Sequence, residues 1–136
     1  MPRLVRAFAA TAFVFLALDF TWLSQTGPRL YRPALGPILA DRPAPAPAIG
    51  FYLAYLTGVF VLVVRPAMAA GRLSRAAGSG ALFGLVAYAT YDLTNQATLK
   101  LWSTTVTVCD LAWGAFATSM ASAAGYLTGR VGGRRE

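Results

Sequence analysis

The chain has 136 residues, of which 57% are hydrophobic and only 12% are charged, and its formal net charge is +7. A soluble domain carries about a quarter charged residues, so this composition indicates a single integral membrane domain over 1–136. The Lys and Arg residues lie between apolar blocks without forming a stripe, which argues against nucleic-acid binding, and the absence of His with a single Cys argues against the usual metal sites and any internal disulfide.

Four apolar segments approach or reach the roughly 20 residues that a helix needs to cross a bilayer. They predict helices over about 4–23, 49–66, 80–99 and 105–127. The fold class is therefore all-α, a bundle of four transmembrane helices. The first segment could instead be a signal peptide, but Asp19-Phe20-Thr21-Trp22, which follows its apolar part, is not a small-residue cleavage site.

The segment between the first two helices, 24–48, is rich in proline. It contains Pro28, Pro33, Pro37, Pro43, Pro45 and Pro47. The alternating run from Pro43 to Pro47 predicts an extended, polyproline-like chain. A stiff connector resting on the bilayer is favoured over a lid that closes on a substrate.

The orientation follows from the Lys and Arg residues between the helices, because cytoplasmic loops are enriched in them. With the N-terminus in the cytoplasm, the inner side holds Arg3, Arg6, Arg65, Arg72, Arg75, Arg130, Arg134 and Arg135. The outer side then holds Arg29, Arg32, Arg42 and Lys100. This distribution predicts that both termini are cytoplasmic, with 24–48 and 100–105 outside. The expected location is the inner membrane of a bacterium, crossed several times.

Small residues recur every four positions on three of the predicted helices. They are Gly50, Ala54 and Gly58 on the second, Gly80 and Gly84 on the third, and Ala117, Ala121, Gly125 and Gly129 on the fourth. Such faces let helix backbones approach closely in lipid. Packing within one bundle is favoured, and a homodimer or docking onto a larger membrane complex stays open as an alternative.

Three aspartates interrupt the apolar segments at similar depth near their outer ends. Asp19 lies on the first helix, Asp92 on the third and Asp110 on the fourth. A charge inside a membrane is costly and needs water, a cation or a polar partner. Two interpretations follow: a polar pocket open to the outer side, or hydrogen bonds that brace the helix ends. The second fits Asp110 well, because this residue lies near a helix N-terminus.

Aromatic and polar neighbours share faces with these aspartates and complete the candidate binding site. Its predicted members are Asp19, Asp92, Asn95, Asp110, Lys100, Tyr88, Trp22 and Trp113. The polar stretch from Tyr91 to Trp102 does not belong against lipid and needs protein or water around it. No metal site is predicted, no motif identifies a cofactor, and no catalytic residue is assigned.

Four stretches resemble a family of predicted bacterial membrane proteins, the domain-of-unknown-function family 2177. They are Leu18–Leu23, Phe51–Tyr55, Tyr91–Trp102 and Asp110–Gly114, and the resemblance extends over about residues 4–127. It implies a membrane fold and location and transfers no mechanism. The family's distinctive polar positions fall, by this resemblance, at Asp19, Asp92, Asn95, Lys100 and Asp110.

Three functions fit these features. The favoured one is binding of a cation or a lipid headgroup by the Asp/Asn cluster near the outer leaflet, with transport as an extension of it. The second is an enzyme that acts on a lipid or isoprenoid, although the sequence lacks a recognisable hydrolase or phosphotransferase motif. The third is an accessory subunit of a larger membrane complex.

Overall fold

The computed structural model describes residues 2–131, which are helical apart from short connections and contain no strand. The helical elements join into four long rods. The first comprises α1 (Arg3–Thr26), η1 (Gly27–Tyr31), α2 (Arg32–Leu35) and η2 (Gly36–Ile38). The second comprises α3 (Pro45–Val59), η3 (Phe60–Val64) and α4 (Arg65–Ala70). The third is α5 (Leu73–Thr98) and the fourth is α6 (Thr104–Val131).

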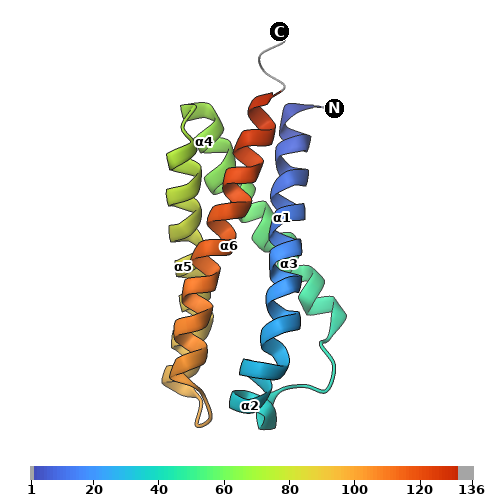
Figure 1. The fold of residues 1–136 in the computed structure, drawn as a ribbon, viewed down its shortest axis with the longest axis vertical. Coiled ribbons are helices and arrows are strands. Elements are labelled where there is room, and N and C mark those ends of the chain that lie inside the picture. The colour runs from blue at the N-terminus through green and yellow to red at the C-terminus, as the bar shows by residue number, and fades with distance from the viewer. Residues whose placement is uncertain (1, 132–136) are drawn as a thin grey trace.

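The rods form an up-and-down bundle in which the start of α1 and the end of α6 lie at the same end (Figure 1). Helix α6 is central, because it packs most extensively against α5 and α1. A tight turn at Gly71 joins α4 to α5, with φ of +67°, a left-handed conformation that glycine adopts without strain. In the lower half of the bundle α5 stays beside α6, whereas α1 and α6 diverge (Figure 1).

The connector over 24–48 is more helical than predicted, and the extended run expected from Pro43 to Pro47 stops at Ala44. Helical turns continue to Ile38, and α3 already begins at Pro45, so the non-helical connection covers only 39–44. Pro45 and Pro47 lie in the first turn of α3, where a proline has no hydrogen bond to lose and its fixed φ suits the helix. Prolines elsewhere in the connector also open short helical turns, so their spacing marked helix starts and not extended chain.

A π-helical turn, η3, separates α3 from α4. It ends two residues before Pro66, which cannot donate the backbone hydrogen bond that a regular helix requires at its position. Above this turn, η3 and α4 pack against α5 and α6. Below it, α3 runs outward from the bundle while α5 stays beside α6 (Figure 1).

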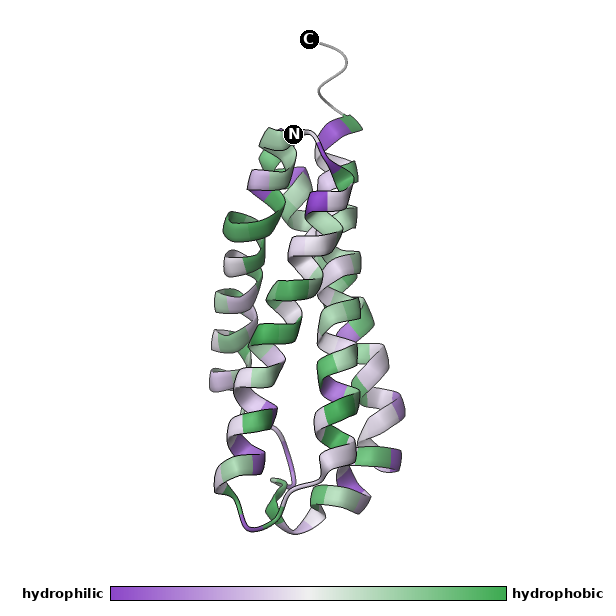
Figure 2. Cartoon of the chain, turned by 90° about the vertical axis from the view of Figure 1, so that its left-hand side faces the viewer, coloured by the Kyte–Doolittle hydropathy of each residue, from purple (hydrophilic) through white to green (hydrophobic). Residues whose placement is uncertain are grey.

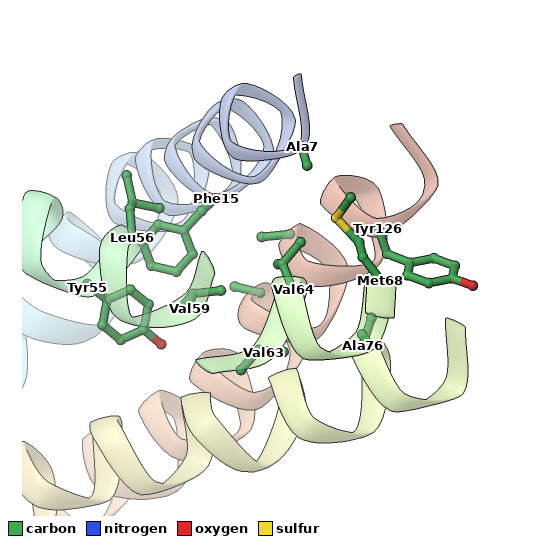
Figure 3. Packing of buried hydrophobic residues seen from close by; sticks show 13 residues of the cluster. Ala7, Phe15, Tyr55, Leu56, Val59, Val63, Val64, Met68, Ala76 and Tyr126 are labelled. Atoms are coloured by element: carbon green, nitrogen blue, oxygen red, sulfur yellow. The ribbon is translucent and has the colours of Figure 1, made fainter. Parts of the chain in front are cut away.

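The apolar core fills the upper and middle parts of the bundle (Figure 3). Phe15 of α1 lies against Tyr55 of α3, with ring centroids 4.9 Å apart, and both are buried. The Tyr55 hydroxyl forms a hydrogen bond of 2.7 Å with that of Thr118 on α6. Tyr55 therefore links the core to the polar residues of the central helix.

The small-residue faces of α5 and α6 are buried within the bundle, which confirms their predicted packing role. A Cβ added at Gly84 would overlap the backbone carbonyl of Gly114, and one at Gly80 would lie 2.9 Å from the carbonyl of Thr118. Gly125 likewise approaches Thr11 of α1. On the second rod the outcome differs, because Gly50 has no neighbour within 4 Å of an added Cβ.

Large apolar side chains point outward from all four rods. The most exposed include Phe13, Phe20, Leu53, Leu62, Leu82, Val86, Val108 and Phe116. Two helices, Arg3–Ile38 and Pro45–Ala70, are long and apolar enough to cross a membrane by length and composition. Strongly hydrophilic residues appear near the upper end and again in the lower half (Figure 2). The polar residues of α6 are buried inside the bundle: Thr107, Asp110, Thr118 and Ser122. They lower the mean hydropathy of the helix although they do not lie on its outer surface.

Candidate functional site

Asp19, Asp92 and Asp110 line one cavity of about 680 Å³ in the lower half of the bundle. All three are buried, with 7%, 0% and 6% of their surfaces exposed. Their helices meet there because Gly84 and Gly114 let α5 and α6 approach closely, while α6 also packs along α1. The structure therefore brings together the three carboxyl groups that the sequence placed at similar depth.

Two of the carboxyl groups are held by tyrosine hydroxyls from other elements. The Tyr52 hydroxyl on α3 donates a hydrogen bond to Asp19 Oδ2. The Tyr31 hydroxyl on η1 donates one to Asp110 Oδ1. Both partners are neutral groups, so these bonds fix the carboxyl groups without neutralising them by an opposite charge.

A second set of contacts fixes Tyr31 in turn. Trp22 Nε1 donates a hydrogen bond of 2.9 Å to the Tyr31 hydroxyl, which itself donates to Asp110. The Trp22 ring stacks on Trp113 of α6 at a centroid distance of 4.5 Å and an interplanar angle of 8°. The connector segment is thus attached to the bundle through a Trp22–Tyr31–Asp110 chain of hydrogen bonds.

Asp92 differs from the other two aspartates. It is fully buried, and neither of its carboxyl oxygens has a hydrogen-bond partner among the described residues. Its closest ionisable neighbour is Asp110, another acid. Burying even a neutral polar group without a hydrogen bond costs about 2–7 kcal/mol, and an unpaired carboxylate costs more. The Asp110 carboxyl group lies within hydrogen-bonding reach, so a shared proton would join the two acids, whereas a charged Asp92 needs a cation.

Aromatic side chains form most of the remaining wall. Tyr88 lines the cavity, as predicted, and its ring covers the backbone of Gly114, where an added Cβ would overlap it. The Tyr88 and Tyr55 rings meet edge to face, with centroids 6.3 Å apart. Trp22 also lines the cavity, whereas Trp113 supports it from behind through the stacked pair.

Asn95 and Lys100 are not part of this cavity. Both line a second, smaller one of about 410 Å³ at the lower end, together with Trp102. Asn95 is half-buried and Lys100 is exposed. Asn95 shares a face of α5 with Asp92 but lies one turn nearer the lower end, beyond Tyr91, which lines both cavities.

The second half of the polar stretch 91–102 serves to brace the bundle. Gln96 donates a hydrogen bond of 2.9 Å to Thr104 and accepts one of 2.8 Å from Thr107. Trp102 Nε1 donates to the Thr107 hydroxyl at 2.9 Å. These bonds tie the end of α5 to the start of α6, as the bracing interpretation requires for this part of the stretch.

The predicted members of the site did not include Tyr31, Tyr52 and Tyr55. A signal was present, because Phe51, Tyr52 and Tyr55 place three aromatic rings within one helical turn. Tyr31 lies in the segment 24–48, outside the four predicted helices. Only the helical continuation of the connector to Ile38 brings its hydroxyl to Asp110.

The cavity combines three carboxyl groups with several aromatic side chains. Within residues 2–131, no group of three or more His, Cys, Asp or Glu side chains is arranged to hold a metal. Aromatic faces attract organic cations, and carboxylates supply the opposite charge. Arg32 and Asp41 lie at the exposed mouth of the same cavity.

Comparisons with known proteins indicate a membrane protein and identify no activity. The model of one protein family, described as a predicted membrane protein, matches residues 4–127. No curated protein and no solved structure matches the chain.

Proposed function

The chain belongs to the DUF2177 family of predicted membrane proteins, and on this premise we propose that its lower cavity binds an organic cation within the bilayer. The observation that carries the proposal is Asp92, a fully buried carboxyl group without a partner in an aromatic-walled cavity. A bound cation would supply the missing opposite charge. Asp19 and Asp110 would surround it from two other helices.

The proposal includes four membrane crossings in the inner membrane of a bacterium. Exposed apolar side chains on α5 and α6, such as Leu82 and Phe116, support it as strongly as those on the first two rods. A soluble monomer rarely exposes so large an apolar surface, whereas lipid would cover it. The excess of Lys and Arg near the start of α1, the α4–α5 turn and the end of α6 supports a cytoplasmic location for that end. The cavity then faces the outer leaflet.

Reporter fusions test this topology. A phosphatase that is active only outside the cytoplasm is expected to be active when fused after Asp41 and inactive when fused after the C-terminus. A fluorescent protein that folds only inside should give the reverse pattern. An externally exposed C-terminus would contradict the proposed orientation and place the cavity in the other leaflet.

Binding of tetraphenylphosphonium to the purified protein in a non-ionic detergent tests the function directly. Equilibrium dialysis should show saturable binding at about one cation per chain. Tetraphenylborate is the matched control, because it has nearly the same size and shape and the opposite charge. Equal binding of both ions would show that only hydrophobic contact is involved, and it would contradict the proposal.

The affinity for tetraphenylphosphonium is also expected to fall as the pH is lowered. A carboxyl group binds the cation only when it is ionised, so protons compete with the cation for Asp19, Asp92 and Asp110. Affinity that does not change between neutral and acidic pH would rule out carboxylates as the binding groups.

A further inference from the structure

Contacts between wall residues close the cavity towards α1 and towards α6, whereas its mouth at Arg32 and Asp41 is exposed. Towards α1, Tyr52 reaches Asp19 by its hydrogen bond, and the Phe15 and Tyr52 rings meet at 6.5 Å. Towards α6, Tyr31 is bonded to Asp110. At the outer end, Leu39 and Pro43 of the connection between η2 and α3 line the cavity. The remaining side of the cavity lies between α3 and α5.

Helices α3 and α5 diverge along the cavity. On this face of the bundle the elements that pack against α5 are η3 and α4, which lie above the cavity. The lowest link between the two helices is made by Tyr55, whose ring meets Phe83 at 5.5 Å and Tyr88 at 6.3 Å. Below Tyr55 the facing residues are Phe51 on α3 and Tyr91 on α5, and both line the cavity.

Phe51 and Tyr91 are 47% and 60% exposed, although both belong to the cavity wall. They therefore form the rim of a lateral opening, which we call the α3–α5 window. The rim is aromatic, and it lies on the side of the bundle rather than at its end. If the bundle spans the membrane, the window opens towards the acyl chains of the lipid.

We propose that the occupant of the cavity is an amphiphile, with a cationic amine head among the aspartates and an alkyl tail that leaves through the α3–α5 window. This inference rests on the proposed function and narrows it to a class of ligand. A carboxyl group below an aromatic rim suits an amine head followed by an apolar chain. An aminophospholipid and a single-chain alkyl amine share this chemistry.

Alkyltrimethylammonium ions with tails of four and twelve carbons test the proposal, since their heads are identical. The measured quantity is the ratio of the two dissociation constants, taken at one fixed detergent concentration. In the wild type we expect the twelve-carbon ion to bind at least about tenfold more tightly, because each buried methylene adds free energy. Phe51→Gln and Tyr91→Gln should each reduce this ratio.

Leu53→Gln is the matched control. Leu53 is 64% exposed on α3, two residues from Phe51, and does not line the cavity. A general loss of affinity leaves the ratio of the two dissociation constants unchanged. Partitioning of the tail into micelles affects all variants equally, because the detergent concentration is constant. A ratio that is the same in the two rim variants as in the wild type would overturn the proposal.

The source of the amphiphile is identified by native mass spectrometry in lipid mixtures. Phosphatidylethanolamine and phosphatidylglycerol with the same acyl chains differ in the amine, so preferential retention of the first indicates a membrane lipid. Retention of the twelve-carbon ion without either lipid indicates a soluble amphiphile. If tetraphenylphosphonium binds but tail length has no effect, the cation site stands and the lateral occupant is wrong. If neither cation binds, the proposed function itself fails.

Discussion

Gly84→Ala is expected to destabilise the bundle by about 3 kcal/mol or more, the upper part of the range for overpacked cores. The added methyl group would overlap the backbone carbonyl of Gly114 and meet the Thr118 side chain. A backbone group cannot move aside as a flexible side chain can, so α5 and α6 would have to separate. The separation would occur beside the three aspartates, where the two helices hold Asp92 and Asp110.

The matched control for this substitution lies on the same helix. Gly78→Ala adds the same methyl group at an exposed position with no neighbour within 4 Å. It should be neutral or stabilising by up to about 1 kcal/mol, because alanine loses less backbone entropy than glycine. Thermal unfolding of both variants in one detergent measures the difference. Equal melting of the two would mean that α5 and α6 do not approach each other at Gly84.

Asp92→Asn is expected to reduce the affinity for tetraphenylphosphonium by at least about 30-fold, in the range found when one partner of a buried charge pair is removed. The amide has nearly the same shape and can donate a hydrogen bond to the neighbouring Asp110 carboxyl group, so the fold should be retained. Stability should be unchanged or higher, because a buried carboxyl group without a partner is replaced by a neutral group.

Cation affinity and stability, measured on the same variant, distinguish binding from bracing. A binding role predicts that Asp92→Asn lowers the affinity and does not lower the stability. If Asp92 only braced the bundle, the substitution would lower the unfolding temperature and leave cation binding intact. Asp41→Asn is the comparison for loss of charge alone, since Asp41 lies at the exposed mouth of the cavity. Its effect on affinity should stay within about threefold, because water screens an exposed charge.

The fold was largely predictable because apolar length is a direct signal for membrane helices. All four predicted segments are helices, and small residues correctly indicated where α5 and α6 approach. The connector was mispredicted because proline has two roles that composition does not separate. It favours extended chain, and it is also well tolerated in the first turn of a helix.

The site was predictable only in part, for a geometric reason. Asp19, Asp92 and Asp110 could be placed at one depth by counting residues along each helix. Direction around the helix decides which residues share a wall, and this depends on how the rods are rotated. Asn95 is separated from the cavity by depth, because it lies one turn nearer the end of α5. Tyr31 and Tyr52 join it through contacts that span 79 and 33 residues of sequence, which no local pattern reveals.

The central position of α6 has a consequence for biosynthesis. If all four helices cross the membrane as proposed, α1 enters the bilayer first and its main packing partner, α6, enters last. Until then, Asp19 has no Asp110 or Trp113 nearby, and Asp92 is not covered by α6. A nascent chain that stops before Thr104 would therefore leave two acidic side chains facing lipid. Ribosomal stalling or truncation in this interval should produce a protein that the cell's membrane proteases recognise, whereas completion of the last helix removes that signal.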